Sequence, residues 1–200
     1  MEKQKGTTKL NGKDLLNIGI FTAIYFLLNL LVAAALGLIP IVSMLIPLVS
    51  SLISGIPMML YLIRIKKFGM ILITYIVYGA FLTLAGVGIY SLIFGTIGAL
   101  IAELILRSGN YQSANRAILS FAVASVGSNA NVLQMVVAGG KALAEKAATY
   151  GADYVNTMVG YYEHRWMLPA VLASAFIGGL LGGLLGKAIF KKHFIRSGLI

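Results

Sequence analysis

The stretch LPAVLASAFIGGLLGGLLGK, residues 168–187, is apolar from its first residue to the lysine that ends it. Its nineteen uncharged residues make a helix of roughly 28 Å at 1.5 Å per residue, which is about the thickness of the hydrocarbon core of a bilayer. Because no water in that core can satisfy a free backbone group, a helix is the natural conformation there. The stretch therefore predicts a membrane-spanning helix over Met167–Phe190.

The composition of the whole chain indicates the same class of protein. Of the 200 residues, 59% are hydrophobic and only 11% are charged, whereas a soluble domain has about 25% charged residues. We therefore expect a multi-pass protein of the plasma membrane, surrounded by the lipid bilayer. The chain has no cysteine, and His164 and His193 stand far apart, so we expect no disulfide, no bound metal and no cofactor.

Five further apolar runs precede the first stretch, and each has the length of a membrane helix. They do not alternate as the strands of a membrane barrel do. The sequence therefore predicts an all-α protein with six transmembrane helices in a single integral membrane domain, residues 1–200. The expected spans are Leu15–Leu36, Val42–Ile63, Phe68–Ala85, Ile89–Leu106, Ala117–Ala138 and Met167–Phe190.

Basic residues lie mostly on one side of this predicted arrangement. Thirteen of the 16 lysines and arginines fall near the two termini, or in the connections between spans two and three and between spans four and five. Only Lys141, Lys146 and Arg165 fall on the other side. The positive-inside rule then places both termini in the cytoplasm. The net charge of +10 reflects topology and lipid headgroups, and we expect no nucleic-acid partner.

The last outer connection, residues 139–166, is long and is the most polar part of the chain. Its apolar and aromatic residues recur at three- and four-residue spacing, which predicts an amphipathic helix on the outer face. The residues of this stripe are Leu143, Ala147, Tyr150, Tyr154, Thr157 and Tyr161. Such a helix either covers the bundle or forms a lid over an outward-facing cavity, and the pattern leaves both interpretations open.

The fifth span carries polar side chains in the segment SVGSNANVLQMVV, Ser125–Val137. Asn129 lies 13 residues beyond Arg116, which is roughly 20 Å along a helix and in the outer half of the bilayer. A carboxamide there needs a partner, which either a neighbouring helix or a ligand provides. Carboxamides with aromatic rings suit a flat, neutral heterocycle. The candidate substrate-binding residues are Asn129, Asn131, Gln134, Ser128, Tyr90, Asn29, Tyr161, Tyr162, His164 and Trp166.

Small residues form stripes in the first and last spans. Gly19 and Ala23 are four residues apart in the first. In the last span, Gly178, Gly182 and Gly186 repeat the same spacing. Such stripes allow helices to approach closely. They serve either packing within the bundle or docking onto another membrane subunit, and all five residues are candidates for docking.

The sequence has neither a G-x-x-x-x-G-K-[ST] phosphate loop nor an H-E-x-x-H motif, so we expect that the chain is not an enzyme. Glu103 is the one acid well inside a span. We expect it to reach the membrane surface or to pair with Arg107, with a proton relay as the alternative. A membrane enzyme and a self-sufficient secondary transporter are the alternative functions, although no convincing pair of repeated halves supports the latter.

The layout of the chain resembles that of a known family. Six spans, a small-residue pair in the first helix and a long outer loop before the sixth helix resemble the S components of energy-coupling factor (ECF) transporters. The phrase LPAVLASAFIGGLLGGLLGK and the asparagine-rich fifth span look most like the Trep_Strep, or MptE-like, group of these proteins. The resemblance covers nearly the whole chain, and Gly19 stands where the family pair AxxxA has its first alanine.

The resemblance implies a membrane-embedded protein that captures a vitamin. It would bind the substrate from outside, between the outer loops and helices four to six. It would dock through its first helix and the neighbours of that helix onto a T subunit driven by two ATPase subunits, and topple in the membrane to deliver the substrate inward. These partners would supply the energy, in agreement with the missing phosphate loop. A hydroxymethylpyrimidine or a pyridoxine-like ring fits the amide and aromatic side chains available.

Overall fold

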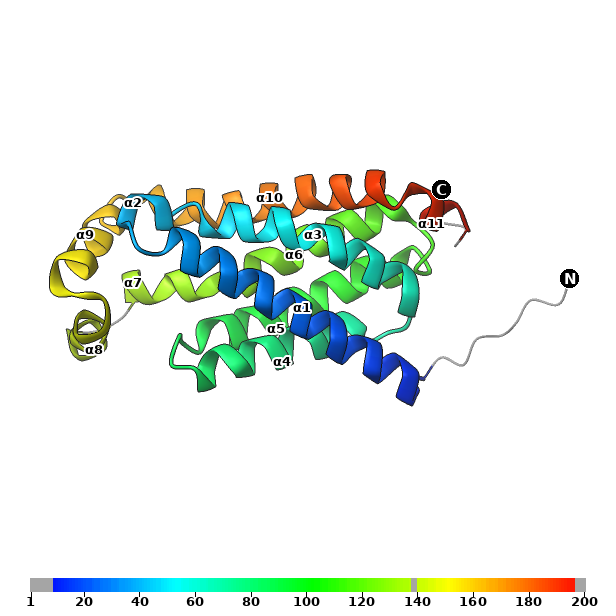
Figure 1. Cartoon of the computed structure of the whole chain (residues 1–200), viewed down its shortest axis with the longest axis horizontal. Helices are drawn as coiled ribbons and strands as arrows, with labels where there is room; N and C mark the ends of the chain where they lie inside the picture. Colours follow the sequence, from blue (N-terminus) through cyan, green and yellow to red (C-terminus); the bar gives the residue numbers. More distant parts are fainter. Residues whose placement is uncertain (1–8, 138–139, 197–200) are drawn as a thin grey trace, which may run out of the picture.

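The computed structural model describes residues 9–137 and 140–196, and every regular element in that part of the chain is a helix. Six long helices form a bundle (Figure 1). These are α1 (Gly12–Leu36), α3 (Ile46–Ile65), α4 (Met70–Leu84), α5 (Tyr90–Ser108), α6 (Ala114–Ser128) and α10 (Met167–Ile189). Shorter helices connect them: α2 (Pro40–Ser43), the 3-10 helix η1 (Ala130–Leu133), α7 (Gln134–Val137), α8 (Gly140–Tyr150), α9 (Ala152–Tyr162) and α11 (Lys191–Arg196).

Five of the described helical stretches are long and apolar enough to cross a membrane: α1, α3, α5, the stretch Ala114–Val137 and α10. They correspond to five of the six expected spans. The remaining one, expected at Phe68–Ala85, forms α4, which has 15 residues. At about 22 Å, α4 is shorter than the hydrocarbon core of about 30 Å. The all-α fold is confirmed, while the sixth span and the cytoplasmic termini stay predictions.

Backbone geometry on both sides of α4 sets its short length. Lys66 ends α3 in the left-handed region, with a φ of 51°, and Gly69 precedes α4 with a φ of 96°. Beyond the other end, Gly86 and Gly88 have φ values of 74° and 139°, which glycine adopts without the steric cost of a side chain. These turns end the helix inside the apolar run that the sequence presents.

Helix α10 packs closely against α3 because glycines on both helices remove the side chains between them. A methyl group added to Gly178 would collide with the carbonyl of Leu48, and one added to Gly182 with the carbonyl of Leu52. From the other side, a methyl group on Gly55 of α3 would collide with the backbone of Gly182. The two backbones are therefore in direct contact, as in other helix pairs built on small residues.

A second glycine face of α10 lies against α6. A methyl group on Gly179 would lie 2.7 Å from Cα of Ala122. A methyl group on Gly183 would lie 3.0 Å from the side chain of Ile118. Since Gly179 and Gly183 each follow a glycine of the first face, the paired glycines in the sequence place α10 between two partners. This helix fixes the position of α6 and its polar residues relative to α3.

Aromatic side chains fill the space between α1, α3 and α4. The ring of Tyr25 meets those of Tyr75 and Tyr78 edge-on, with centroids 5.4 and 4.9 Å apart, a favourable geometry for aromatic pairs. The hydroxyl of Tyr61 in α3 donates to the carbonyl of Met70 at 2.7 Å. These buried contacts hold α4 against the bundle.

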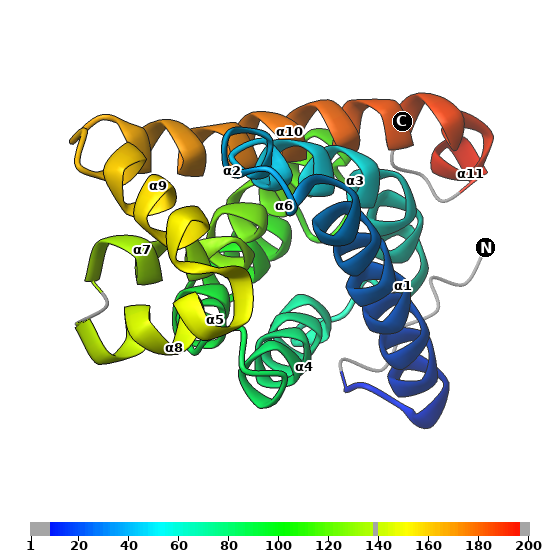
Figure 2. The same cartoon turned by 60° about the vertical axis from the view of Figure 1, so that its left-hand side comes forward.

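One end of the bundle is covered by α2, α7, α8 and α9, and we call it the cap end; α11 lies at the opposite end (Figures 1 and 2). The expected amphipathic helix of residues 139–166 is in fact two helices, α8 and α9, separated at Gly151, whose φ is 91°. The break also changes the buried face. Helix α9 buries Val155, Met158 and Tyr162, while Thr157 of the expected stripe is exposed.

Candidate functional site

The amide of Asn129, at the end of α6, ties helices together. Its Nδ2 donates to the carbonyl of Ser125 at 2.9 Å and to Oγ of Ser51 at 3.3 Å. Its Oδ1 accepts a hydrogen bond from Oγ of Ser50 at 3.5 Å. Both ends of this amide thus have partners inside the bundle. Of the two interpretations that the sequence allowed, interhelical hydrogen bonding is the one seen for Asn129.

Ser128 and Asn29 belong to the same network. Oγ of Ser128 shares a hydrogen bond of 2.8 Å with the hydroxyl of Tyr25 in α1. Nδ2 of Asn29, also in α1, donates to Oγ of Ser54 in α3 at 3.2 Å. The network therefore joins α1, α3 and α6. Sequence reasoning missed the partners on α3, although the run SSLIS (residues 50–54) places three hydroxyls inside an apolar span.

Asn131 lies in η1 and belongs to a second group, around the N-terminus of α5. Its Oδ1 accepts a hydrogen bond from the backbone N–H of Ser91 at 2.9 Å, and its own N–H donates to Oγ of Ser91 at 3.3 Å. This reciprocal pair works as a capping box does, but between two elements. Nδ2 of Asn131 is buried and has no hydrogen-bond partner among the described residues. Such an unpaired donor costs about 1–3 kcal/mol.

Gln134 completes the second group from the start of α7. Its Nε2 donates to the carbonyl of Val87 in the α4–α5 turn at 2.9 Å. Gly88 makes room for this amide, because a methyl group there would collide with Nε2 of Gln134. Tyr90 stacks on Phe94 within α5, with an angle of 8° between the rings and 6.5 Å between the centroids. The structure thus places two candidate amides and one candidate ring around the start of α5.

Two of the expected aromatic residues come from α9 and adjoin this group. Tyr162 is buried with Met44, Met158 and Val171, and Tyr161 packs on the same cluster together with Val132 and Met135. Val132 and Met135 lie next to Asn131 and Gln134 in sequence. Helix α9 therefore packs directly on the segment that carries the second group of amides.

His164 and Trp166 stand apart from both groups of amides. Their rings meet edge-on with centroids 6.4 Å apart, and Trp166 is 63% exposed. No hydrogen bond from either side chain to a candidate amide is present among the described residues. We therefore place them on the surface of the cap end.

Glu103 contradicts the expectation drawn from its sequence position. It is fully buried instead of reaching the membrane surface, and its Oε2 accepts the backbone N–H groups of Ile71 at 3.0 Å and Leu72 at 3.4 Å. Its Oε1 accepts the hydroxyl of Tyr111 at 3.3 Å. Arg107 lies instead over the ring of Phe68, 5.6 Å from its centroid. A carboxylate at a helix N-terminus is well placed, so Glu103 caps α4 from α5.

The five candidate docking residues divide into two sets. The three glycines of α10 (Gly178, Gly182 and Gly186) face α3 of the same chain, so their contact here is packing within the bundle. Gly19 and Ala23 of α1 are exposed, and a methyl group added to Gly19 would have no neighbour within 4 Å among the residues that the structure describes. Only the stripe on α1 is open to a partner.

A comparison with protein families identifies the class of the chain. The profile of a family described as hypothetical bacterial integral membrane protein (Trep_Strep) matches residues 12–196. The chain belongs to the Trep_Strep family. Membership confirms the prediction of an integral membrane protein, and it confirms the Trep_Strep part of the resemblance. No curated protein and no solved structure matches the chain.

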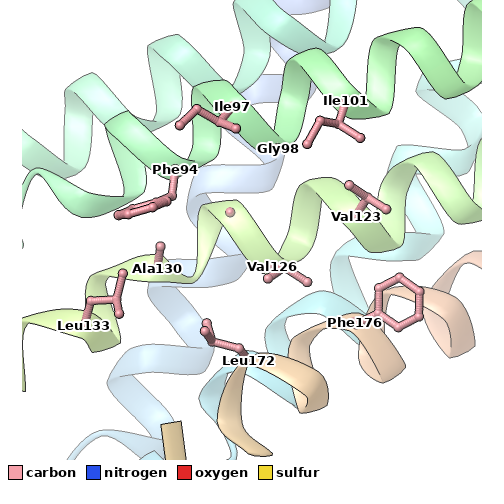
Figure 3. Close-up of a pocket in the computed structure, with 11 residues that line it drawn as sticks. Phe94, Ile97, Gly98, Ile101, Val123, Val126, Ala130, Leu133, Leu172 and Phe176 are labelled. Atoms are coloured by element: carbon pink, nitrogen blue, oxygen red, sulfur yellow. The ribbon is translucent and has the colours of Figure 1, made fainter. Parts of the chain in front are cut away.

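The Trep_Strep chain also has an apolar groove of about 440 Å³ between α5, α6 and α10. Figure 3 shows its lining residues, which come from these three helices and η1. They are Phe94, Ile97, Gly98, Ile101, Val123, Val126, Gly127, Ala130, Leu133, Leu172 and Phe176. Because no polar side chain lines it, this groove is unsuited to a heterocycle that must be hydrogen-bonded.

Proposed function

We propose that this Trep_Strep protein is the substrate-binding S component of an ECF-type importer. It captures a small vitamin or vitamin precursor at the cap end, which faces outward, and docks on a T subunit with two ATPase subunits. The resemblance of nearly the whole chain to S components supports this proposal. Within the structure, the observation that carries it is Nδ2 of Asn131, which is buried and has no hydrogen-bond partner in the described part of the chain.

A bound heterocycle would give this donor its acceptor. A ring nitrogen or a carbonyl oxygen of the ligand suits an amide N–H, and the neighbouring amide of Gln134 and ring of Tyr90 offer a second polar contact and a stacking face. The segment that holds Asn131 lies beneath α9 through Val132 and Met135. In this proposal α9 is the lid, and Asn129 holds the helices that form the floor.

The exposed stripe on α1 supports docking to a T subunit. In the most apolar 18-residue stretch of α1, only 28% of the residues are buried within the chain, whereas 56% are buried in the corresponding stretch of α3. Gly19 and Ala23 lie on the open side, where a partner helix can approach closely. The α10 glycines are occupied by α3 and take no part in this proposed interface.

Purification of the chain from its native membrane in mild detergent tests the proposal. We expect mass spectrometry to find a T subunit and two ATPases with it, and a bound vitamin-sized heterocycle. The isolated chain should hydrolyse no ATP. ATP hydrolysis by the pure chain, or a chain that purifies alone under conditions that keep other membrane complexes intact, would contradict the proposal.

The candidate ligands are tested on the isolated chain. We expect hydroxymethylpyrimidine or pyridoxine to raise the melting temperature, since a ligand that binds only the folded state stabilises it. A phosphorylated sugar of similar size is the control. It should not bind, because the neutral amides and aromatic rings of the described cap-end site do not neutralise a phosphate. If neither heterocycle binds, the substrate class is wrong, while copurification of the T subunit would still support the S-component assignment.

A further inference from the structure

The groove between α5, α6 and α10 is open on the outer surface of the helix bundle. Three of its lining residues on α5 are strongly exposed: Phe94 at 42%, Ile97 at 51% and Ile101 at 46%. All three helices that form its walls belong to stretches long and apolar enough to span a membrane. The medium that meets the groove is therefore hydrocarbon, and water would find no hydrogen-bond partner in it.

Glycines create the hollow. Gly98 of α5 and Gly127 of α6 leave the two backbones in contact, because a methyl group placed on Gly127 would collide with the carbonyl of Phe94. Phe94 and Ile101 on one side and Val123 and Phe176 on the other rise around this floor. A flexible chain of methylene groups can follow such a groove and form dispersion contacts with its lining residues.

Two cations stand where the same three helices reach the end of the bundle opposite the cap. Arg116 at the start of α6 donates from Nη1 to Oγ of Ser108 at 2.6 Å. Lys187 at the end of α10 donates from Nζ to Oδ1 of Asn115 at 3.3 Å. Both hydrogen bonds are exposed, and both acceptors are uncharged oxygens. Neither cation forms an ion pair among the described residues, whereas Lys67 pairs with Asp14. Both side chains can therefore bind an anion.

The distances along the helices connect the two features. Val123 lies seven residues from Arg116, which is roughly 10 Å, and Phe176 lies eleven residues from Lys187, roughly 16 Å. Half of the hydrocarbon core, the reach of one acyl chain in its leaflet, is about 15 Å. A lipid with its phosphate at these cations thus reaches the nearer end of the groove, at Val123, with the distal part of its chain.

We propose that the groove and the two cations together form a binding site for one anionic phospholipid of the leaflet at the Arg116–Lys187 end. One acyl chain enters the groove from that end, and the phosphate group contacts both cations. The charge of the cations favours this occupant over a zwitterionic lipid and over an uncharged helix of a partner. The groove borders the proposed vitamin site at Phe94 and η1, but the binding of an anionic lipid does not depend on that site.

Native mass spectrometry of the purified chain, equilibrated with mixed micelles of equal phosphatidylglycerol and phosphatidylcholine, tests the site. We expect one retained lipid per chain, with phosphatidylglycerol preferred roughly 25-fold at about fivefold for each cation. The double variant Arg116→Gln/Lys187→Gln should retain a lipid without this preference. Its control, Lys9→Gln/Lys13→Gln, makes the same change in net charge on α1 and the segment before it, and should behave as wild type.

The groove is tested with two tryptophan variants of equal exposure. Ile97→Trp fills the groove, and Ile177→Trp changes a residue of α10 that is 50% exposed and does not line it. Losing ten or so carbon contacts should lower the retained lipid about tenfold for Ile97→Trp, with no change for Ile177→Trp. Equal retention in both variants, equal loss in both, or no lipid preference in wild type would each overturn the proposal, as would a retained peptide or vitamin in place of the lipid.

Discussion

Asn129 and Asn131 are two carboxamides two positions apart in the chain, and their surroundings differ completely. The amide of Asn129 has hydrogen-bond partners on both its oxygen and its nitrogen. Asn131 uses its oxygen to cap α5, and its buried nitrogen has no partner within residues 9–137 and 140–196. The same residue type is therefore a structural tie in one position and the best candidate for a ligand contact in the other.

Substitutions separate these two roles. Asn131→Ala should weaken binding of the copurified heterocycle about 5- to 150-fold, from a lost hydrogen bond worth about 1–3 kcal/mol. Asn131→Asp should weaken it as well, because it retains the oxygen that caps α5 and loses the donor. Asn129→Ala should lower the melting temperature and leave the affinity unchanged. Calorimetric titration and thermal unfolding of the same variants give both quantities, and wild-type affinity for Asn131→Asp would refute the assignment.

Tyr162 gives the cap end a dependence on alkaline pH. Burial, with a smaller effect of Tyr154, raises the pKa of Tyr162 to about 12, above its ordinary value of about 10. The folded state thus holds its proton more tightly than the unfolded state. The resulting stability is fully present below about pH 10 and is lost as the pH rises toward about 12.

The melting temperature should therefore be flat from pH 7 to 9 and fall between about pH 10 and 12. Tyr162→Phe removes the ionisable group and should fall less steeply in that range. Tyr150→Phe, a variant of an exposed tyrosine in α8, is the matched control and should follow wild type. Identical alkaline profiles for wild type and Tyr162→Phe would show that this phenol does not titrate with unfolding.

At the residue scale the sequence indicated which side chains are unusual but not how they are bonded. The depth of the amides in an apolar run was readable, since it depends only on spacing along a helix. Their partners on α3 and α5 depend on which helices become neighbours, and spacing does not reveal that. Glu103 is the clearest case: its local neighbour Arg107 suggested a pair, whereas the structure joins it to the start of α4, some thirty positions away.

At the scale of single helices, the two small-residue stripes have opposite environments. Gly182 lies against the backbone of α3, while Gly19 has open space around it. The sequence spacing is the same in both, so the pattern alone left packing and docking open. Burial separates them, because a stripe already occupied within the chain is not available to a second protein.

Leucine substitutions at the two glycines test this difference. Gly182→Leu forces α10 away from α3 and should destabilise the isolated chain by about 1–3 kcal/mol or more. Gly19→Leu should leave the melting temperature of the isolated chain unchanged and prevent copurification of the proposed T subunit. Unfolding in detergent and pull-down from membranes provide the two measurements. A Gly19→Leu chain that assembles and transports normally would remove α1 from the interface.

Most of the helices were predictable because apolar length alone specifies them. Five expected spans appear as long apolar helices with ends shifted by a few residues. The errors fall at glycines with positive φ. Gly69 delays the start of α4 by two residues relative to the expected span Phe68–Ala85, and Gly151 divides the expected amphipathic helix into α8 and α9. A glycine inside a helical pattern reads as a tolerated residue, and only the tertiary structure shows where the chain uses it to turn.

At the scale of the whole molecule, the predicted sixth span requires α4 to cross the bilayer. Since the chain contains no cysteine, single cysteines report the side of the membrane without background. If α4 crosses, Phe68→Cys and Val87→Cys should react with a membrane-impermeant thiol reagent from opposite sides. Gln112→Cys and Asp153→Cys mark the two reference sides. Labelling of Phe68→Cys and Val87→Cys from the same side would reduce the number of spans to five.

The two glycine faces of α10 have a consequence for how the gene can vary. Each glycine pair holds one residue against α3 and the next against α6. A larger side chain at Gly178, Gly179 or Gly182 would displace a backbone, and one at Gly183 would displace the side chain of Ile118. The leucines between the pairs are partly or largely exposed, with Leu181 at 45% and Leu184 at 52%, and any apolar residue can replace them in lipid. Along GGLLGGLLG, two positions that require glycine thus alternate with two that accept any apolar residue, because α10 packs between α3 and α6.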